Sequence, residues 1–321
     1  MNEVVRAAAL LRAGELVAFP TETVYGLGAD ASNPGAIARI FAAKGRPADH
    51  PLIVHLPDAG QLECWAVDIP EAAHGLAAAF WPGPLTLILR RHPSVSDAIT
   101  GGQDTVGLRV PNHPLALQLL REFGGGVAAP SANRFGRVSP TTAAHVRDEL
   151  GAAVSMILDG GPCAVGIEST ILDLSGDRAR ILRPGMLDAA AIAAVLGYPP
   201  ASGAERSSPR VSGALETHYA PATELQLVAA GELAQALRVG LAAGRRIAVL
   251  ADPQLLQAYE GIACHPASPD PVRFAHDLYA ALRELDALGG DLILVAAPPE
   301  EEAWRAVNDR LRRAAAASKS G

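Results

Sequence analysis

Cysteine is scarce in this chain, and its spacing excludes two classes of architecture. Only three cysteines, Cys64, Cys163 and Cys264, occur among 321 residues, and no two of them form a C-x-x-C pair. A disulfide framework and a zinc–cysteine cluster both need several cysteines at close spacing. We therefore predict that the three thiols are small buried hydrophobic side chains.

Several sequence signatures of cofactor and metal sites are missing. Gly26-Leu-Gly28 lacks the third glycine of a dinucleotide-binding fingerprint, and no G-x-x-x-x-G-K-[S/T] loop occurs. His50, His55 and His218 do not stand at the spacing of an H-E-x-x-H metal motif. The sequence thus predicts neither a P-loop nor a dinucleotide site, and no metal held by protein side chains.

Long hydrophobic runs and an excess of basic residues are also absent. No apolar stretch is long enough to span a membrane, and the N-terminal segment Met1–Arg6 does not resemble a signal peptide. The formal net charge is −7, which argues against nucleic-acid binding over the whole surface but leaves a local basic pocket open. We expect a cytoplasmic protein without membrane contact.

The length and one change of composition indicate two domains. Single hydrophobic cores seldom grow beyond about 250–300 residues. Residues 198–222 are rich in Pro, Ser and Gly, which is typical of a linker. We therefore predict a first domain over 1–197, a linker over 198–222 and a second domain over 223–321.

Hydrophobic patterns predict an α/β fold in both domains. In the first, expected strands cover 15–19, 51–56, 85–90, 105–110, 126–129 and 156–158, with an antiparallel pair over 167–173 and 180–183. Because strands both alternate with helices and pair locally, we expect a mixed sheet. In the second, strands over 225–229, 247–250 and 292–295 alternate with helices over 231–243, 271–288 and 301–317, which predicts a small parallel sheet.

One stretch stands out as a candidate site, Phe19-Pro-Thr-Glu-Thr-Val-Tyr-Gly-Leu-Gly28. It places two hydroxyls, a carboxylate and a phenol directly after a buried strand, where open α/β sheets often bind ligands. Gly26 and Gly28 would let the backbone approach a ligand closely. The alternative is that Thr21 and Thr23 are turn residues and that the glycines serve packing.

Cations and hydrogen-bond donors recur at other expected strand and helix ends. They are Lys44, Arg46, Arg109, Ser131, Asn133, Ser169, Thr170 and Arg183. Such a set suits a polyanion, most simply a nucleoside triphosphate. Lys44 and Arg46 could instead neutralise a helix C-terminus, Arg109 could be a surface residue, and Ser131–Asn133 could be an ordinary turn.

An ordered series of motifs resembles the YrdC-like family. It comprises Pro20–Gly28, Lys44-Gly-Arg-Pro47, Pro51–His55, Gly107–Pro111, Pro130-Ser-Ala-Asn133, Glu168-Ser-Thr170 and Leu182-Arg-Pro-Gly185. With its second domain, the chain resembles the long, two-domain L-threonylcarbamoyladenylate synthases of that family. The resemblance implies an open twisted mixed sheet with helices forming a concave pocket, followed by a smaller Rossmann-like α/β domain.

The resemblance also implies a reaction. L-threonine, bicarbonate and ATP would give L-threonylcarbamoyl-AMP and pyrophosphate, with Mg²⁺ accompanying ATP. A separate tRNA threonylcarbamoyl transferase complex would then modify adenosine 37 of tRNAs that read ANN codons. Three alternatives remain: an RNA-binding protein with a weak tRNA contact, a regulatory nucleotide-binding module, and a carbamoyl-transfer module.

By resemblance, particular residues receive roles. Thr23, His55, Arg109, Ala129 and Ser169 would face threonine, with Arg109 pairing its carboxylate. Arg46, His50, Thr105, Ser131, Asn133, Arg183 and Tyr219 would face ATP, and Lys44 and Arg46 would act in catalysis. His50 stands where the family often has asparagine, and Ala129 where some members have threonine, so only the backbone of Ala129 could contact the substrate. We further expect the linker to form a lid that excludes water from the product.

Overall fold

A computed structural model describes residues 2–213, 217–257 and 261–318, so residues 214–216 of the predicted linker lie outside the described residues. The chain forms two compact units, one comprising Met1–Phe135 and Pro140–Ala214, the other Gly136–Ser139 and Leu215–Gly321. The short segment Gly136–Ser139 therefore leaves the first unit and packs within the second. No helix of the described part is long and apolar enough to cross a membrane.

The N-terminal unit is built on a ten-stranded open sheet in the order β10-β9-β8-β4-β5-β3-β6-β2-β1-β7. The strands are β1 (Val17–Phe19), β2 (Gly26–Asp30), β3 (Ile53–His55), β4 (Leu85–Arg90), β5 (Thr105–Arg109), β6 (Val127–Ala128), β7 (Met156–Ile157), β8 (Thr170–Asp173), β9 (Arg180–Arg183) and β10 (Ala201–Ser202). Parallel pairs such as β3–β5 stand beside antiparallel pairs such as β4–β5 and β8–β9. The predicted mixed sheet and the antiparallel pair are confirmed.

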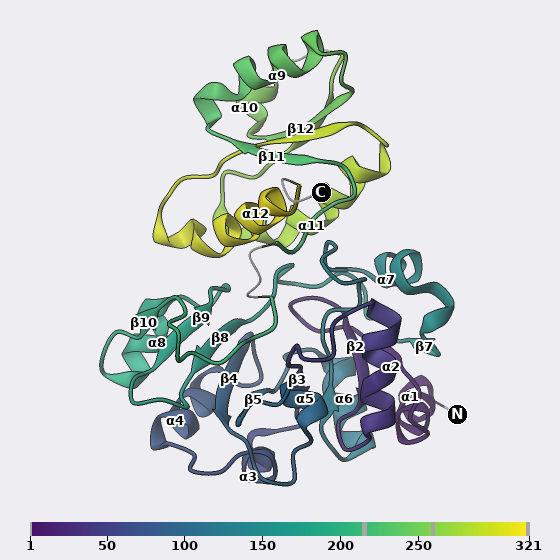
Figure 1. The fold of residues 1–321 in the computed structure, drawn as a ribbon, viewed down its shortest axis with the longest axis vertical. Coiled ribbons are helices and arrows are strands. Elements are labelled where there is room, and N and C mark those ends of the chain that lie inside the picture. Colours follow the sequence, from purple (N-terminus) through teal and green to yellow (C-terminus); the bar gives the residue numbers. More distant parts are fainter. Residues whose placement is uncertain (1, 214–216, 258–260, 319–321) are drawn as a thin grey trace. The chain divides into compact units, whose positions relative to one another are not determined.

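Helices surround this sheet (Figure 1). They are α1 (Glu3–Arg12), α2 (Pro34–Lys44), α3 (Leu62–Trp65), α4 (Glu71–Phe80), α5 (Asp97–Thr100), α6 (Pro114–Phe123), α7 (Ala143–Leu150) and α8 (Ala189–Leu196). Helix α2 matters for the site because its ends are fixed. Asn33 caps its first turn, and Gly45 ends it in the left-handed conformation at φ 62°, so Lys44 is its last residue.

Strand β2 is an element that the sequence did not predict. Its glycines made Gly26–Gly28 resemble a ligand-binding loop, but they form a strand antiparallel to β1. A Cβ atom on Gly28 would lie 2.8 Å from the Phe19 ring and 3.0 Å from Val127. At this position the close approach is therefore to the protein's own core.

The C-terminal unit contains a four-stranded parallel sheet in the order β11-β14-β12-β13. The sequence predicted a small parallel sheet here, with three of these strands. Its strands are β11 (Leu225–Val228), β12 (Ile247–Ala251), β13 (Ala263–Pro266) and β14 (Leu292–Ala296). Figure 1 shows α9 (Leu233–Ala242) and α10 (Pro253–Leu256) on one face, and α11 (Pro271–Ala287) and α12 (Arg305–Ser318) on the other. Strand β13 was not predicted, because its side chains are mostly half-exposed or exposed.

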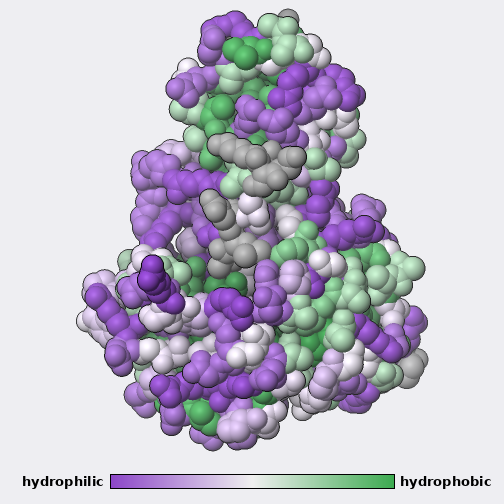
Figure 2. Space-filling view, in the orientation of Figure 1, coloured by the Kyte–Doolittle hydropathy of each residue, from purple (hydrophilic) through white to green (hydrophobic). Residues whose placement is uncertain are grey.

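The surface view in Figure 2 is mainly hydrophilic, with smaller hydrophobic areas between. The cysteines differ from the prediction in part. Cys163 is buried, but Cys64 is exposed and Cys264 only partly buried, because the short helix α3 points Cys64 outward.

Candidate active site

A tight turn after β1 presents the Thr23 hydroxyl. The Thr21 hydroxyl donates to the Val24 carbonyl at 2.6 Å and accepts the backbone N–H groups of Thr23 and Val24, each at 3.2 Å. The two hydroxyls lie 2.8 Å apart. Whichever hydroxyl donates in this contact, the Thr23 oxygen keeps at least one lone pair with which to accept a hydrogen bond.

Arg109, at the end of β5, lies in a buried ion pair. Its Nη2 is 2.6 Å from Oε1 of Glu22, although the two groups are not aligned for a hydrogen bond, and both side chains are at most 7% exposed. The Arg109 Nε donates to the Gly83 carbonyl at 3.2 Å, and the other Glu22 oxygen accepts the Asn112 N–H at 2.9 Å. The guanidinium is thus fixed from two sides, and its charge is balanced before any substrate binds.

His55 is the neighbour of Arg109 across the β3–β5 pair. Burial and then the positive charge of Arg109 lower the pKa of His55 to about 3. The imidazole is therefore neutral at physiological pH. It can hydrogen-bond to a substrate, but it cannot serve there as a cation.

Lys44 is buried at the end of α2 instead of lying exposed at a helix terminus. Its Nζ donates to the carbonyls of Ser131 and Asn133, at 2.5 Å for Asn133. Burial and then the charge of Arg46 hold the pKa of Lys44 well below its usual value. Lys44 therefore ties the 131–133 loop to the α2 end, and a bound anion would stabilise its charged form.

Arg46 and His50 lie beside the ring of Phe135. The Arg46 guanidinium carbon is 5.9 Å from the ring centroid, and the His50 ring meets Phe135 edge-on at 5.3 Å. Arg46 also donates to the Pro51 carbonyl at 2.9 Å. Burial and the nearby charge of Arg46 lower the pKa of His50, so this histidine is a neutral donor or acceptor near neutral pH, as the family's asparagine would be.

Ser169 hydrogen-bonds to Arg183, a predicted site residue, and lies beside Thr86, which was not predicted. Its hydroxyl lies 2.8 Å from that of Thr86 on β4 and accepts from Nη2 of Arg183 at 3.1 Å. The Arg183 Nε also donates to the Ser169 carbonyl at 3.1 Å. Thr86, Ser169 and Arg183 therefore form one buried polar cluster across β4, β8 and β9.

The linker residues 210–212 cover this part of the sheet. The Ser212 carbonyl accepts from Nη1 of Arg183 at 2.9 Å, and Val211 packs on an apolar cluster formed by Ile88, Ile171 and Leu182. The backbone of Arg210 exchanges two hydrogen bonds with Gln103, at 2.6 and 3.1 Å. Between this segment and the sheet a cavity of only about 10 Å³ remains, beside Thr105. A nucleotide could not occupy that space unless the segment moved.

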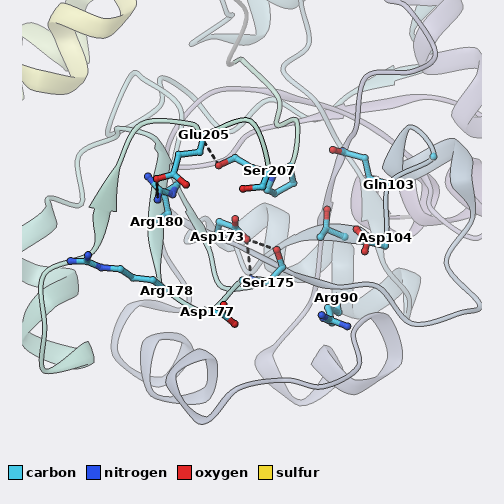
Figure 3. Close-up of a pocket in the computed structure, with 15 residues that line it drawn as sticks. Arg90, Gln103, Asp104, Asp173, Ser175, Asp177, Arg178, Arg180, Glu205 and Ser207 are labelled. Atoms are coloured by element: carbon cyan, nitrogen blue, oxygen red, sulfur yellow. Dashed lines mark hydrogen bonds and ion pairs between the residues drawn. The ribbon is translucent and has the colours of Figure 1, made fainter.

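A larger cavity of about 750 Å³ lies beside the small one, with Gln103 and Thr105 in the walls of both (Figure 3). Thr105 lines it, whereas Arg109 ends the same strand four residues later, roughly 13 Å away. Its wall carries both signs of charge: Arg180 pairs with Glu205, and Arg178, Asp173 and Asp177 also line it. It does not contain the Glu22–Arg109 or the Ser169–Arg183 cluster, so we centre the site on those residues.

The structure places most of the predicted residues in polar groups of the N-terminal unit, and it places two residues elsewhere. Thr105 stands at the far end of β5, and Tyr219 belongs to the C-terminal unit. There Tyr219 is 1% exposed, stacks on Tyr279 at 5.9 Å and has the Arg310 guanidinium 5.1 Å from its ring. The N–H of Ala129 is already bonded to the Ile53 carbonyl, which leaves its own carbonyl for a substrate.

Glu22 and Thr86 were missed as site residues. Glu22 was visible in the Thr-Glu-Thr sequence but carried no signal of its ion pair with a residue 87 positions later. Thr86 is the one hydroxyl in the apolar strand Leu85–Leu89, fully buried there. A polar residue in a buried strand was the signal that could have identified it.

Comparisons with known proteins agree along the whole chain. A Sua5/YciO/YrdC family model described as "Telomere recombination" matches residues 9–185, and one described as "Threonylcarbamoyl-AMP synthase, C-terminal domain" matches 187–316. The threonylcarbamoyl-AMP synthase of Bacillus subtilis is 41% identical to this chain, and the alignment covers 98% of this chain and 93% of the B. subtilis protein. The synthase of Pyrococcus abyssi is 40% identical, and that alignment covers 96% of this chain and 92% of the P. abyssi protein. The P. abyssi Sua5 structure complexed with L-threonine superposes with a TM-score of 0.91 at 38% identity, over 98% of this chain and 95% of that one.

Proposed function

Because this chain belongs to the Sua5/YrdC family of threonylcarbamoyl-AMP synthases, we propose that the clusters around Arg109 and Arg183 are its threonine and ATP subsites. The enzyme makes L-threonylcarbamoyl-AMP from L-threonine, bicarbonate and ATP and releases pyrophosphate, the first step of N6-threonylcarbamoyladenosine formation in tRNA. The observation that carries the assignment of subsites is the pre-fixed Arg109, which Glu22 and Gly83 hold.

The proposed threonine subsite is built around Arg109 and Thr23, whose side chains are already held by neighbouring groups. Arg109 supplies guanidinium N–H groups to the α-carboxylate, and the acceptor oxygen of Thr23 takes an N–H of the substrate amine. Neutral His55 ends β3, and Ala129, which offers its carbonyl, directly follows β6, the neighbour of β3. Ser169, directly before β8, faces the same substrate and accepts a hydrogen bond from Arg183.

The proposed ATP subsite uses Arg183, which bonds to Ser169, together with the cations Arg46 and Lys44. In the proposed reaction the threonine amine and bicarbonate have condensed to a carbamate with loss of water, and the carbamate oxygen attacks the α-phosphorus while pyrophosphate leaves. Arg183, Arg46 and Lys44 stabilise the phosphate charge, and Ser131, Asn133 and His50 supply hydrogen bonds. Lys44 does so from the end of α2, where it already holds the 131–133 loop.

We propose that Mg²⁺ enters with the phosphates of ATP and not on protein carboxylates. Among the described residues no group of three or more His, Cys, Asp or Glu side chains is placed to hold a metal ion. Glu22, a carboxylate of the site, already serves Arg109 and the Asn112 N–H. ATP phosphates supply the oxygen ligands that Mg²⁺ prefers.

The linker is the proposed lid. The contacts of Arg210, Val211 and Ser212 place it directly on Arg183 and next to Thr105. Closure over bound substrates would keep water from a reactive mixed anhydride. Tyr219, in the His-Tyr-Ala-Pro stretch that follows, is proposed to reach the nucleotide when the lid closes.

The product requires a partner that transfers threonylcarbamoyl groups to tRNA, and we propose the tRNA threonylcarbamoyl transferase complex for that role, with at most a weak direct contact to tRNA. The same pathway supports a cytoplasmic location.

The test of the subsites is binding of each substrate alone. Arg109→Lys should weaken L-threonine binding at least about tenfold, since a bidentate guanidinium is lost, and should leave ATP binding within twofold. Arg183→Lys should do the reverse. If both variants weakened the same ligand only, the assignment of two separate subsites would be wrong.

A further inference from the structure

The C-terminal unit contains a cavity of its own, of about 380 Å³. Its wall is mostly apolar: Phe274 and Trp304 meet edge-on at 5.5 Å, and Leu255, alanines and prolines complete it. Two polar side chains, Asp252 and Ser268, also reach the wall. A concave, largely apolar cavity of this size with a few polar groups has the composition of a small-molecule site.

The cavity lies where open parallel sheets bind ligands. Asp252 directly follows β12, Ala267 and Ser268 follow β13, and Ala296 ends β14 with Ala297 to Pro299 after it. The wall is therefore formed at the carboxyl ends of three parallel strands. In the strand order β11-β14-β12-β13, β12 and β14 are neighbours. From β12 the chain continues toward β13, at one edge of the sheet. From β14 it continues to α12, which packs on β11, at the other edge. The cavity is therefore at the point where the direction of the connections reverses, the usual place for a ligand in this architecture.

The wall also defines the charge of the ligand. Among the described residues that line the cavity none is Lys, Arg or His, whereas Asp252 is a carboxylate. One oxygen of Asp252 caps helix α10 by accepting the Gln254 N–H at 2.8 Å. The Ser268 hydroxyl accepts the Asp270 N–H at 3.2 Å. Phosphates and other anions are disfavoured here, and a cation or N–H donor can pair with the second oxygen of Asp252.

We propose that this cavity binds a small organic ammonium compound, with an aromatic or aliphatic body packed on Phe274 and Trp304 and the ammonium group at Asp252. Aromatic faces attract cations as well as apolar groups, which fits the pairing of two rings with one carboxylate. The site is separate from the proposed adenylate chemistry, because all its wall residues lie in the second unit. It gives that unit a binding role of its own.

The test is calorimetric titration of the full-length protein with 2-phenylethylamine and, as the matched anion, phenylacetate. We expect saturable one-to-one binding of the amine and binding at least about tenfold weaker for the acid. Asp252→Asn should weaken the amine at least about tenfold while preserving the fold, since asparagine caps helices as well as aspartate does. Ala297→Leu, at a partly exposed wall position, should fill the cavity and weaken both probes.

Three outcomes would overturn the proposal: no saturable binding of the amine, equal binding of amine and acid, or unchanged amine binding in both variants. Circular dichroism and the thermal midpoint show that each variant is folded. Pyrophosphate release is measured on the same samples and should stay at the wild-type level in Asp252→Asn, so loss of this site is distinguishable from loss of the synthase activity.

Discussion

Glu22→Gln tests the buried ion pair on which the threonine subsite rests. At 2.6 Å, the Glu22–Arg109 attraction is about 6 kcal/mol for an effective dielectric constant of about 20. Removing one charge of a buried pair leaves the other uncompensated, which costs about 3–5 kcal/mol. Gln keeps the shape and can still accept the Asn112 N–H, so the lost charge dominates the effect.

Thermal unfolding measures this loss. At about 2–4 °C per kcal/mol for a unit of this size, the midpoint should fall by roughly 6–20 °C. Saturating L-threonine should raise the midpoint more in the variant than in the wild type, because its carboxylate restores a partner for Arg109. Adenylate formation should nevertheless be slower, since Arg109 has lost one of its two supports.

The matched control is Glu15→Gln. Glu15 also pairs with an arginine, Arg39, at 2.6 Å, but both side chains are well exposed, and the midpoint should move only slightly. Equal shifts for the two variants, or a threonine effect no larger in Glu22→Gln than in the wild type, would refute the reasoning.

Three further predictions concern other parts of the site. Lys44→Met should lower pyrophosphate release at least about 10²-fold with the fold intact, and an unchanged rate would reduce Lys44 to a helix-end residue. His55→Asn should make the folded protein less sensitive to acid. The pKa of His55 is about 3 in the folded state and about 6.5 in the unfolded state, so its contribution to the free energy of unfolding is present above pH 6.5. That contribution is lost as the pH falls from 6.5 toward 3, by about 1.4 kcal/mol per pH unit. Denaturant titrations at pH 6 and 4 should therefore show a smaller loss in the variant than in the wild type, and equal losses would contradict the buried neutral imidazole. Val211→Asp should place a charge on the apolar cluster, open the lid and shorten the lifetime of the adenylate. The control Ala204→Asp, at an exposed linker position, should leave that lifetime unchanged. Equal adenylate lifetimes in the two variants would argue against a lid.

Local sequence signals predicted much of the fold. Apolar runs located β4, β5, β8 and β9 within two or three residues, and the parallel second sheet followed from alternating strands and helices. The predictions failed where tertiary contacts override local preference. Gly26 and Gly28 weaken strand propensity, yet both belong to β2, and at Gly28 a Cβ would lie only 2.8 Å from the Phe19 ring.

The site was predicted in composition but not in connectivity. The motifs contained Arg109, Ser169 and Arg183, because polar residues at strand ends are conspicuous. The sequence could not show three pairings: Glu22 with Arg109, Lys44 with the carbonyls of the 131–133 loop, and Arg183 with the Ser212 carbonyl. The partners in these pairs are 29 to 89 residues apart. Long-range pairs depend on the topology of the sheet, which local patterns leave open.

The most direct test of the central claim is pyrophosphate release from ATP by the purified chain, with L-threonine and bicarbonate each omitted in turn. The account predicts release only when both are present, and its loss in Arg109→Ala. Release that needs neither co-substrate, or that survives Arg109→Ala unchanged, would contradict it.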